Sequence, residues 1–533
     1  RRYQKTLSKN FTLYADYKKN FNDRHDLSVM VGTSHESENY DRFTAKRINF
    51  DQQENMSLQL GSAQDQNAWS EGNQWTINSF FSRVNYTFAN KYVIEGTIRA
   101  DGSSRFDPDH RWGWFPGVNA AWRVGEEGFM KRLGWFEDLK VRASYGEMGN
   151  QSGIGLYDYI QLISLSNDYY PFGTGVKGQM ATSGNIISTS RTWETIQTTN
   201  VGFDFSTLNN RLYGSFDYFW KENKNMLIPK TYPSMLGADA PSTNSGHLSI
   251  HGWEISLGWR DQIKDFSYSV RFNISDAKNK VVDQVGSNLI KLGNNETPTG
   301  YPLNSYFGYE FDGIIQNEQE LEAYKSRFSE GGIPGDLSVG DAMYKDLDGD
   351  GKLSVLGDGK EGSGDVKYLG DKNPRYNFGF NLSMAWKGFD LSAFIQGVGR
   401  RTMFLEGESR CPMPEAWYQS AEYWYGKTWT PERTDAQYPA ITLKDKRNYN
   451  YYVSTNTKFN VAYARLKNLQ FGYTIPQTLT SKAGLQKVRV YFSGEDLFEV
   501  HNTPNGWDPE ENSGSITSYP FTRNYSFGIN VVF

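Results

Sequence analysis

Large apolar residues and small polar residues alternate along the C-terminal segment 523–533. The apolar positions are Tyr525, Phe527, Ile529, Val531 and Phe533. The positions between them are polar or small, except for Val532. Side chains of an extended strand point alternately to its two faces. A strand of about ten residues with one apolar and one polar face is typical of a strand that crosses a membrane in a β-barrel.

The same alternation recurs elsewhere in the chain. It is found in four further segments: 266–275, 376–386, 468–475 and 488–493. Their apolar positions are too aromatic for a surface in contact with water, and their polar positions are too polar for a soluble core. The pattern therefore predicts an all-β protein whose strands form a transmembrane antiparallel β-barrel.

The alternation and the turn residues together predict fifteen strands. These are 9–18, 25–37, 79–88, 92–102, 113–124, 139–148, 198–208, 211–223, 251–260, 266–276, 375–386, 388–399, 463–475, 487–498 and 523–533. Tight turns are predicted at 89–91, 209–210 and 387–388, where the residue types favour them. Long loops are predicted at about 38–78, 149–197, 224–250, 277–374, 400–462 and 499–522.

The long loops and the tight turns fall at opposite ends of the predicted strands. If Phe533 lies at the periplasmic end, every very long loop lies outside and each tight turn lies inside, as in outer-membrane barrels. Two connections of middle length are less regular: 125–138 falls inside and 103–112 falls outside. Fifteen is odd, whereas bacterial single-chain barrels have an even number of strands. We therefore expect the barrel to be incomplete at its N-terminus.

Composition adds to this interpretation. The 34 Tyr, 33 Phe and 15 Trp are enough to form the aromatic girdles of an outer-membrane barrel. No stretch approaches the roughly 18 apolar residues of a membrane-spanning helix. The net charge of -5 argues against a nucleic-acid partner. Cys411 is the single cysteine, so no intrachain disulfide can form.

An ordered series of short motifs runs along nearly the whole chain. It includes FSRVNYTF at 81–88, YVIEGTIRADGSSRF at 92–106, WGWFP at 112–116, AAWR at 120–123, LKVRASYG at 139–146, GNQ at 149–151, WE at 193–194, NVGFD at 200–204, NNRL at 209–212, DLDGDG at 346–351, RLKNLQFGY at 465–473, GEDLF at 494–498 and DPE at 508–510. With the terminal strand, this series resembles the C-terminal barrel portion of the SusC/RagA-like family of TonB-dependent outer-membrane transporters from Bacteroidetes.

The resemblance implies a 22-stranded barrel with a plugged lumen. It also implies import of glycans or peptides, a SusD-like lipoprotein as partner on the cell surface, and energy from TonB through a segment near the N-terminus. The TonB box, the plug and about seven strands of such a barrel have no counterpart in this chain. The expected location is the outer membrane of the cell, in contact with its lipid.

One loop carries a candidate calcium site. Carboxylates at alternate positions followed by glycine, in 346–354, match the loop of an EF-hand. The candidate ligands are Asp346, Asp348, Asp350, the carbonyl of Lys352 and the hydroxyl of Ser354. Position twelve of the loop is Gly357 where an EF-hand has Glu, although Asp365 lies close by. A solvated acidic turn without an ion is the alternative.

Aromatic residues gather in two of the predicted external loops. Tyr169 and Tyr170 lie in one, and Trp417 and Trp424 lie in another. Flat aromatic rings stack on sugars and on apolar peptide side chains, so these four residues are candidates for substrate binding. Contact with a capping partner, packing within the loop and an interfacial girdle are the alternatives.

The sequence favours a nutrient importer over other functions. No nucleophile elbow or phosphate-binding loop occurs, so an enzyme is not expected. Three alternatives stay open: a TonB-dependent siderophore or cobalamin receptor, a non-transporting surface barrel such as an adhesin, and a soluble β protein. The substrate itself is not specified by the sequence.

Overall fold

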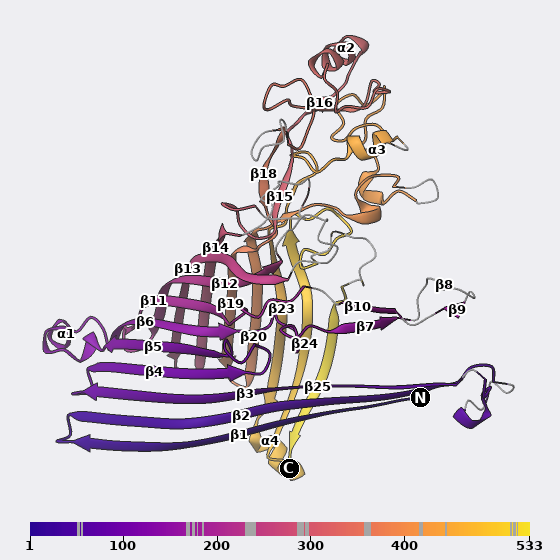
Figure 1. Ribbon diagram of the computed structural model, residues 1–533. Coiled ribbons are helices and arrows are strands. Elements are labelled where there is room, and N and C mark those ends of the chain that lie inside the picture. Colours follow the sequence, from indigo (N-terminus) through magenta and orange to yellow (C-terminus); the bar gives the residue numbers. More distant parts are fainter. Residues whose placement is uncertain are drawn as a thin grey trace.

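The fold is that of a computed structural model, in which one large curved sheet carries folded loops at one end (Figure 1). The structure describes residues 1–533 except 51–53, 55–56, 65, 167–170, 173–175, 178–179, 184–185, 230–240, 285–292, 294–297, 357–363, 415–418, 443–444, 512–513, 515–518 and 520. Among the described residues, no helix is both long and apolar enough to cross a membrane.

Fifteen strands form the large sheet, and each pairs antiparallel with the next one along the chain. They are β1 (Arg2–Phe21), β2 (His25–Lys46), β3 (Asn67–Phe88), β4 (Tyr92–Ser103), β5 (Trp112–Trp122), β6 (Asp138–Asn150), β11 (Glu194–Thr207), β12 (Leu212–Pro229), β13 (Ser242–Ile263), β14 (Phe266–Asp283), β19 (Arg375–Trp386), β20 (Phe389–Arg400), β23 (Tyr463–Ile475), β24 (Lys487–His501) and β25 (Asn524–Val532). Because neighbours in the sheet are also neighbours in sequence, the connections alternate strictly between its two ends.

The remaining elements lie in the connections. The short strands are β7 (Ile163–Ser166), β8 (Pro171–Phe172), β9 (Val176–Lys177), β10 (Met180–Ser183), β15 (Ser305–Tyr309), β16 (Phe311–Ile314), β17 (Ala342–Tyr344), β18 (Val366–Asp371), β21 (Thr402–Met403) and β22 (Phe459–Asn460). The helices are α1 (Gly128–Leu133), α2 (Glu318–Arg327), α3 (Asp445–Asn450) and α4 (Gln477–Thr480), with short 3-10 turns η1 (Leu58–Leu60), η2 (Val124–Glu126), η4 (Gly407–Ser409), η5 (Glu422–Trp424) and η6 (Ser481–Ala483).

All fifteen predicted strands are confirmed, but several extend further than predicted. β2 continues to Lys46 and β3 starts at Asn67, so much of the predicted loop 38–78 is strand. Likewise, β13 begins at Ser242 and β14 ends at Asp283, which shortens the predicted loops 224–250 and 277–374. These extensions are polar and lie beyond the apolar alternation, so hydropathy gave no signal for them. In these extensions the hydrogen bonds between neighbouring strands continue, although the side chains no longer face lipid and so need not be apolar.

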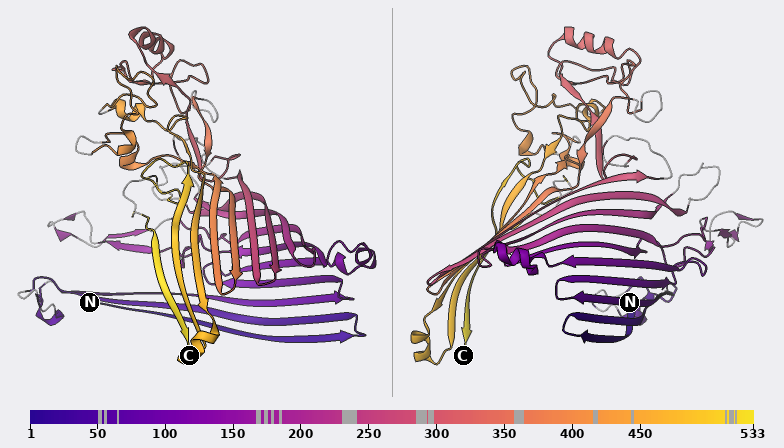
Figure 2. Two further views of the ribbon diagram at one scale, coloured as in Figure 1. Left: turned by 180° about the vertical axis from the view of Figure 1, so that it is seen from behind. Right: turned by 90° about the vertical axis from the view of Figure 1, so that its left-hand side faces the viewer.

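The sheet is strongly twisted and open. In two views, β19 to β25 run at a steep angle to β1 to β6, as expected when right-handed twist accumulates over many strands (Figure 2). β1 and β25 are its two edge strands and do not pair with each other. All residues of β1 are exposed on both faces. The closed barrel therefore stays a prediction, while the antiparallel sheet is confirmed.

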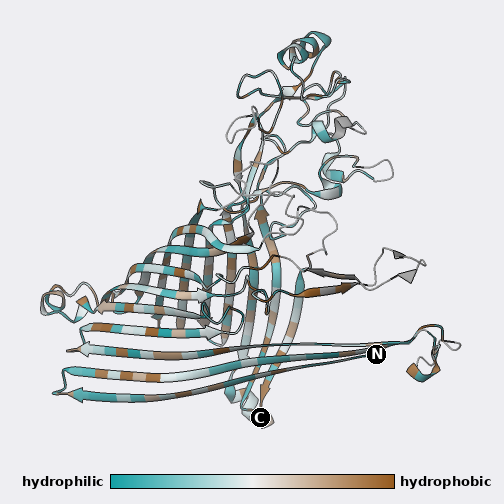
Figure 3. Ribbon diagram, viewed as in Figure 1, coloured by the Kyte–Doolittle hydropathy of each residue, from teal (hydrophilic) through white to brown (hydrophobic). Residues whose placement is uncertain are grey.

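Hydrophilic and hydrophobic residues are interspersed along the strands of the sheet (Figure 3). Register places Phe272 of β14 between Leu257 of β13 and Phe380 of β19, so apolar residues face apolar ones across the strands. The next residue, Asn273, pairs with Gly379 on the opposite face. The apolar face matches lipid and the polar face matches a lumen, as the sequence predicts.

The tight turns have the backbone that their residues favour. Ala89 and Asn90 have φ of 50° and 57°, and Lys387 and Gly388 have φ of 44° and 88°. Positive φ at both central residues is typical of the turns that match the twist of a hairpin. Asn209 also has a positive φ of 59°, so all three predicted tight turns are confirmed.

The two faces of β19 provide a test of the assignment to lipid and lumen. Phe380→Arg places a charge toward lipid, and it is expected to destabilise the barrel by roughly 2–4 kcal/mol. Asn381→Arg places the same charge in the lumen, opposite Arg271, and is expected to cost at most about 1 kcal/mol through repulsion. The free energy of unfolding from lipid vesicles measures both. Equal losses at the two positions would refute the assignment.

Candidate functional site

The polar face of the sheet carries a row of side chains that crosses five strands. Direct cross-strand pairing aligns Asn85, Glu95, Asn119, Ser144 and Asn200. Glu95 accepts hydrogen bonds from Asn85 at 3.3 Å and from Asn119 at 3.1 Å. These residues line a cavity of about 330 Å³ on this face. The row offers donors and acceptors to whatever occupies the lumen.

An ion-pair cluster lies beside this row. The Arg142 guanidinium donates to both oxygens of Asp204, at 3.0 and 2.9 Å, and to both oxygens of Asp217, at 2.7 and 2.8 Å. Lys140 reaches Asp204 at 2.8 Å. Nearer the C-terminus, Arg489 binds both oxygens of Asp390. Bidentate pairs fix the position of both partners, so the lumen wall is polar and also rigid.

A folded unit built from two long connections stands over one end of the sheet (Figure 1). It comes from 298–374 and 401–462, and we call it the loop unit. Its first core is formed by Tyr309, Ile315, Leu321, Tyr324, Phe328, Leu337, Ala342, Tyr344, Leu353 and Tyr449. Since Tyr449 comes from the second connection and the others from the first, this core joins the two connections.

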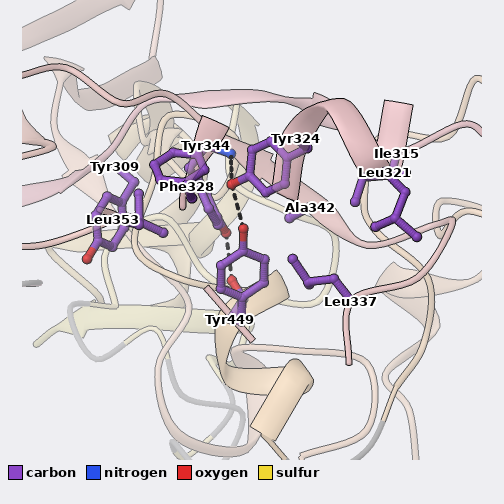
Figure 4. Close-up of a cluster of buried hydrophobic side chains, with 10 residues drawn as sticks. All are labelled: Tyr309, Ile315, Leu321, Tyr324, Phe328, Leu337, Ala342, Tyr344, Leu353 and Tyr449. Atoms are coloured by element: carbon purple, nitrogen blue, oxygen red, sulfur yellow. Dashed lines mark hydrogen bonds between the residues drawn. The ribbon is translucent and has the colours of Figure 1, made fainter. Parts of the chain in front are cut away.

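Buried tyrosines bond across this core (Figure 4). The hydroxyl groups of Tyr324 and Tyr449 lie 2.6 Å apart. The amide of Tyr344 donates to the Tyr324 hydroxyl at 2.9 Å, and the Tyr344 hydroxyl donates to the Tyr449 carbonyl at 2.8 Å. Burial raises the pKa of Tyr324 to about 12, so its hydroxyl stays protonated and can donate. Satisfied buried polar groups of this kind select one packing arrangement.

The second core of the loop unit contains Trp424. Its buried members are Met403, Leu405, Cys411, Tyr423, Trp424, Tyr438, Tyr451 and Val461, together with Trp507 from the connection between β24 and β25. The Trp424 ring packs against Tyr438 and Tyr451, with ring centroids 4.9 and 5.5 Å away. The small cavity beside it measures about 10 Å³, too small for a sugar ring. Trp424 therefore packs the loop core in this structure and does not face a ligand.

The burial of Trp424 favours packing within the loop, one of the alternatives given for it, and its role in substrate binding stays a prediction. The presence of an aromatic residue in a loop does not show whether its ring packs inside the loop or is exposed to a ligand. Within the same aromatic cluster, Tyr425 is 89% exposed, compared with 3% for Trp424. Tyr425 is thus the better candidate for contact with a ligand or partner. The other three candidates, Tyr169, Tyr170 and Trp417, lie outside the described residues.

A buried arginine anchors the last connection to the sheet. Arg465 on β23 is 2% exposed, pairs with Asp508, and lies 3.2 Å from Glu510. Arg401 donates to the carbonyls of Pro509 and Glu511, at 2.7 and 2.9 Å. The residue pattern alone predicts no role for these arginines. The sequence does contain a sign of the contact between Arg465 and Asp508. The segments 465–473 and 508–510, which hold these residues, both belong to the ordered series of motifs.

The acidic loop 346–354 brings together three carboxylates. One carboxylate oxygen from each of Asp346, Asp348 and Asp365 lies within 4.8 Å of the others. Asp365 is fully buried and accepts from the amides of Leu347 at 2.6 Å and Ser354 at 2.8 Å. Burial and the charges of Asp348 and Asp346 raise the pKa of Asp365. Excess negative charge of this kind, offered by oxygen ligands, suits a hard divalent cation.

The predicted ligands behave differently from one another. Asp346 and Asp348 belong to the cluster of carboxylates. The third member is Asp365, whereas the sequence predicts Asp350. Asp350 instead accepts from the amide of Lys352 at 2.8 Å, which is an ordinary turn contact. The Ser354 hydroxyl is buried and has no hydrogen-bond partner among the described residues, so it could serve as a ligand. The geometry fits a cation, with a ligand set that differs from the EF-hand order.

Comparison with known proteins identifies the family. Residues 1–497 match the family described as "TonB dependent receptor-like, beta-barrel". The chain belongs to this family. The family lies in the outer membrane, so this chain is an outer-membrane β protein. The resemblance noted in the sequence is thereby confirmed.

Several relatives and solved structures resemble the chain over its whole length. It is 31% identical to TonB-dependent receptor P3 of Formosa agariphila, over 99% of this chain and 52% of the relative. It is 26% identical to TonB-dependent receptor SusC of Bacteroides thetaiotaomicron, over 98% of this chain and 50% of the relative. The structure of the RagAB peptide transporter matches with a TM-score of 0.80, 23% identity, and coverage of 99% and 56%. The chain thus spans about half the length of the relatives that it matches.

The packing role of Trp424 can be tested against its exposed neighbour. Trp424→Ala removes a ring from a filled core and is expected to destabilise the loop unit by about 3–5 kcal/mol. Tyr425→Ala is the matched control and is expected to change stability by no more than about 0.5 kcal/mol. Amide hydrogen exchange within 401–462 measures both effects. Similar protection in the two variants would show that Trp424 does not hold the core together.

Proposed function

We propose that this chain forms barrel wall and outer loops of an importer of oligomeric nutrients, energised by TonB and assisted by a SusD-like surface lipoprotein. The observation that carries the proposal is the loop unit, which stands over one end of a polar lumen wall. Two cores and a tyrosine network hold this unit in shape. A preformed outer surface of this extent suits recognition of a long ligand, which must be bound at several points.

The relatives support this choice of cargo and partner. One relative is SusC of Bacteroides thetaiotaomicron, and the fold matches that of a peptide transporter. The polar row through Glu95 and the exposed Tyr425 ring are groups that hydrogen-bond to and stack on sugars or peptides. We keep glycan and peptide as the two cargo classes. Transport of either needs no covalent chemistry by this chain.

Purification of the complete native protein from its outer membrane tests the proposal. We expect a surface lipoprotein to be purified with it in equal amount, and an oligosaccharide or peptide to be released on denaturation. Uptake of that ligand should stop when TonB is deleted. Recovery of the protein without a lipoprotein, carrying a ferric chelate, would refute the proposal in favour of a siderophore receptor.

The orientation of the sheet can be tested on intact cells. The proposal places the loop unit outside and the tight turn Lys387-Gly388 on the periplasmic side. A protease added outside should cleave within 277–374 or 400–462 and leave the 387–388 turn intact. Mapping of the fragments by mass spectrometry shows which bonds are cut. Cleavage at Lys387 in intact cells would reverse the assignment.

We further propose that the acidic loop binds Ca²⁺ and thereby stiffens the loop unit. Asp346, Asp348 and Asp365 would supply carboxylate oxygens, and the Ser354 hydroxyl would supply another. Asp365→Asn should abolish calcium binding, because it removes the buried member of the cluster. Asp350→Asn is the matched control and should retain binding, since Asp350 lies outside the cluster. Titration calorimetry on the complete protein measures both, and equal loss in the two variants would favour the EF-hand order.

The raised pKa of Asp365 gives this site a pH dependence. Because the charged form of Asp365 is disfavoured in the folded loop, the contribution of this residue to the stability of the calcium-free loop is fully present only below the usual pKa of Asp. This contribution is lost as the pH rises through the raised pKa of Asp365. A bound cation offsets the loss, because it stabilises the charged carboxylate. We therefore expect calcium to raise the melting temperature more near neutral pH than under acidic conditions. An equal increase at both pH values would contradict a role for Asp365.

A further inference from the structure

Three large apolar side chains are exposed in the connection between β5 and β6, residues 123–137. Phe129 is 47% exposed, Leu133 is 51% exposed and Trp135 is 67% exposed. Because the connections alternate between the two ends of the sheet, this segment lies at the end opposite the loop unit, together with the tight turn 89–91 (Figure 1). Exposed apolar side chains grouped in one short segment mark a surface that contacts another molecule or a membrane.

Glu127, at the start of α1, is bound to the apolar face of the sheet. Tyr92 of β4 shares its face with Ile94, which is 52% exposed, and the polar residue Glu95 lies on the other face. Trp122 of β5 is the direct cross-strand partner of Tyr92. Glu127 accepts a hydrogen bond from the Tyr92 hydroxyl at 2.6 Å and another from the Trp122 indole at 3.2 Å. These bonds hold the start of α1 at the apolar face.

Phe136 holds the other end of the segment at the same face. Its ring packs edge-on against Phe205 of β11, with ring centroids 6.3 Å apart. Phe205 shares its face with Phe203, which pairs with Val141 of β6. Val141 pairs in turn with Trp122 of β5. Phe205 and Trp122 therefore lie on one face, so the segment is fixed to the apolar side of the sheet at both of its ends.

The contacts of Glu127 also indicate the depth of the segment. Phe88, Tyr92 and Trp122 form a row of stacked rings across β3, β4 and β5, with neighbouring centroids 6.3 Å apart. All three residues lie at the ends of their strands. Tyr and Trp rings near the strand ends of a barrel lie at the level of the lipid headgroups, with their polar groups toward water. Because Glu127 binds the polar groups of two of these rings, α1 begins at the headgroup level.

Helix α1 has an apolar side and a charged side. Phe129 and Leu133 are four residues apart in the helix, so they lie on the same side. Lys131 lies about 200° around the helix from Phe129. Its ammonium group is 2.6 Å from the Glu126 carboxylate. An amphipathic helix at the headgroup level typically lies in the plane of the membrane, with its apolar side toward the acyl chains.

We propose that residues 123–137, which we call the anchor segment, bind the phospholipid leaflet on the periplasmic side of the outer membrane. Phe129, Leu133 and Trp135 insert among the upper parts of the acyl chains, and Lys131 stays among the headgroups. Lipid is favoured over a protein partner because the anchor segment continues the apolar face at both of its ends. The proposal rests on the assignment of that face to lipid and of the tight turns to the periplasm. It depends neither on the cargo nor on the surface lipoprotein.

Fluorescence quenching in phosphatidylcholine vesicles tests the proposal on the complete protein, in which Cys411 and any further cysteine are replaced by Ala. A bimane label is attached at one position at a time, in Leu133→Cys, Lys131→Cys or Phe380→Cys. Lipid brominated near the headgroup should quench the label at 133 more strongly than lipid brominated near the chain end. The label at 131, on the charged side of α1, should instead be quenched by aqueous iodide. The label at 380, on the apolar face of β19, should be quenched by brominated lipid and not by iodide.

Three results at position 133 would overturn the proposal. Iodide quenching as strong as at 131 would place the anchor segment in water, and stronger quenching by bromine near the chain end would place it within the hydrocarbon. Protection from both quenchers would indicate a protein that covers the segment. The label at 380 separates these failures from a wider one, because iodide quenching there would refute the assignment of the apolar face to lipid itself. Heat-dependent mobility in electrophoresis shows that each variant is folded.

The positioning role of Glu127 is tested with the label at 133. Glu127→Ala should remove the quenching by brominated lipid, because it releases α1 from the rings of Tyr92 and Trp122. Glu126→Ala is the matched control and should leave that quenching unchanged, since Glu126 contacts neither ring. Equal quenching in the two variants would show that Glu127 does not hold the anchor segment at the membrane.

Discussion

The structure depends above all on pairing the backbone hydrogen-bonding groups of its strands. In hydrocarbon no water can satisfy a free N–H or C=O group, so each strand needs a partner on both edges. The thirteen inner strands of the sheet meet this need in sequence order, each lying between the strand that precedes it and the strand that follows it. That order fixes which connections share an end. It therefore also places the loop unit, with its acidic loop, at one end of the sheet.

The same constraint explains why the sheet could be predicted from the sequence. A strand with lipid on one side and a lumen on the other must alternate in polarity, and this alternation is clear in five of the predicted strands. Turn residues such as Asn90 and Gly388 marked where hairpins close. The missed strand ends, at Lys46 and Ser242, lie in polar extensions where both faces meet water or loops. There the side chains carry no pattern, although the ladder continues.

The packing of the loop unit could not be predicted from local patterns, because its cores are formed by residues that lie far apart in the chain. Tyr324 and Tyr449 meet across 125 positions, and no local feature of either predicts the other. For the same reason the sequence suggested Trp424 as a ligand contact, whereas its partners Tyr438 and Tyr451 bury it. The acidic loop was predicted in part. Its motif was visible, but the third carboxylate, Asp365, arrives from beyond the loop.

The central claim is that one face of the sheet contacts lipid up to a defined height and the other lines a lumen. Spin labels placed singly at 266–280 of β14, in the complete protein with Cys411 replaced, test it most directly. Accessibility to oxygen should alternate with period two and be highest at even positions up to Ile274. From Asp276 onward the even positions should instead become accessible to a water-soluble reagent. Accessibility without period two, or an unbroken lipid signal through Lys280, would contradict the account.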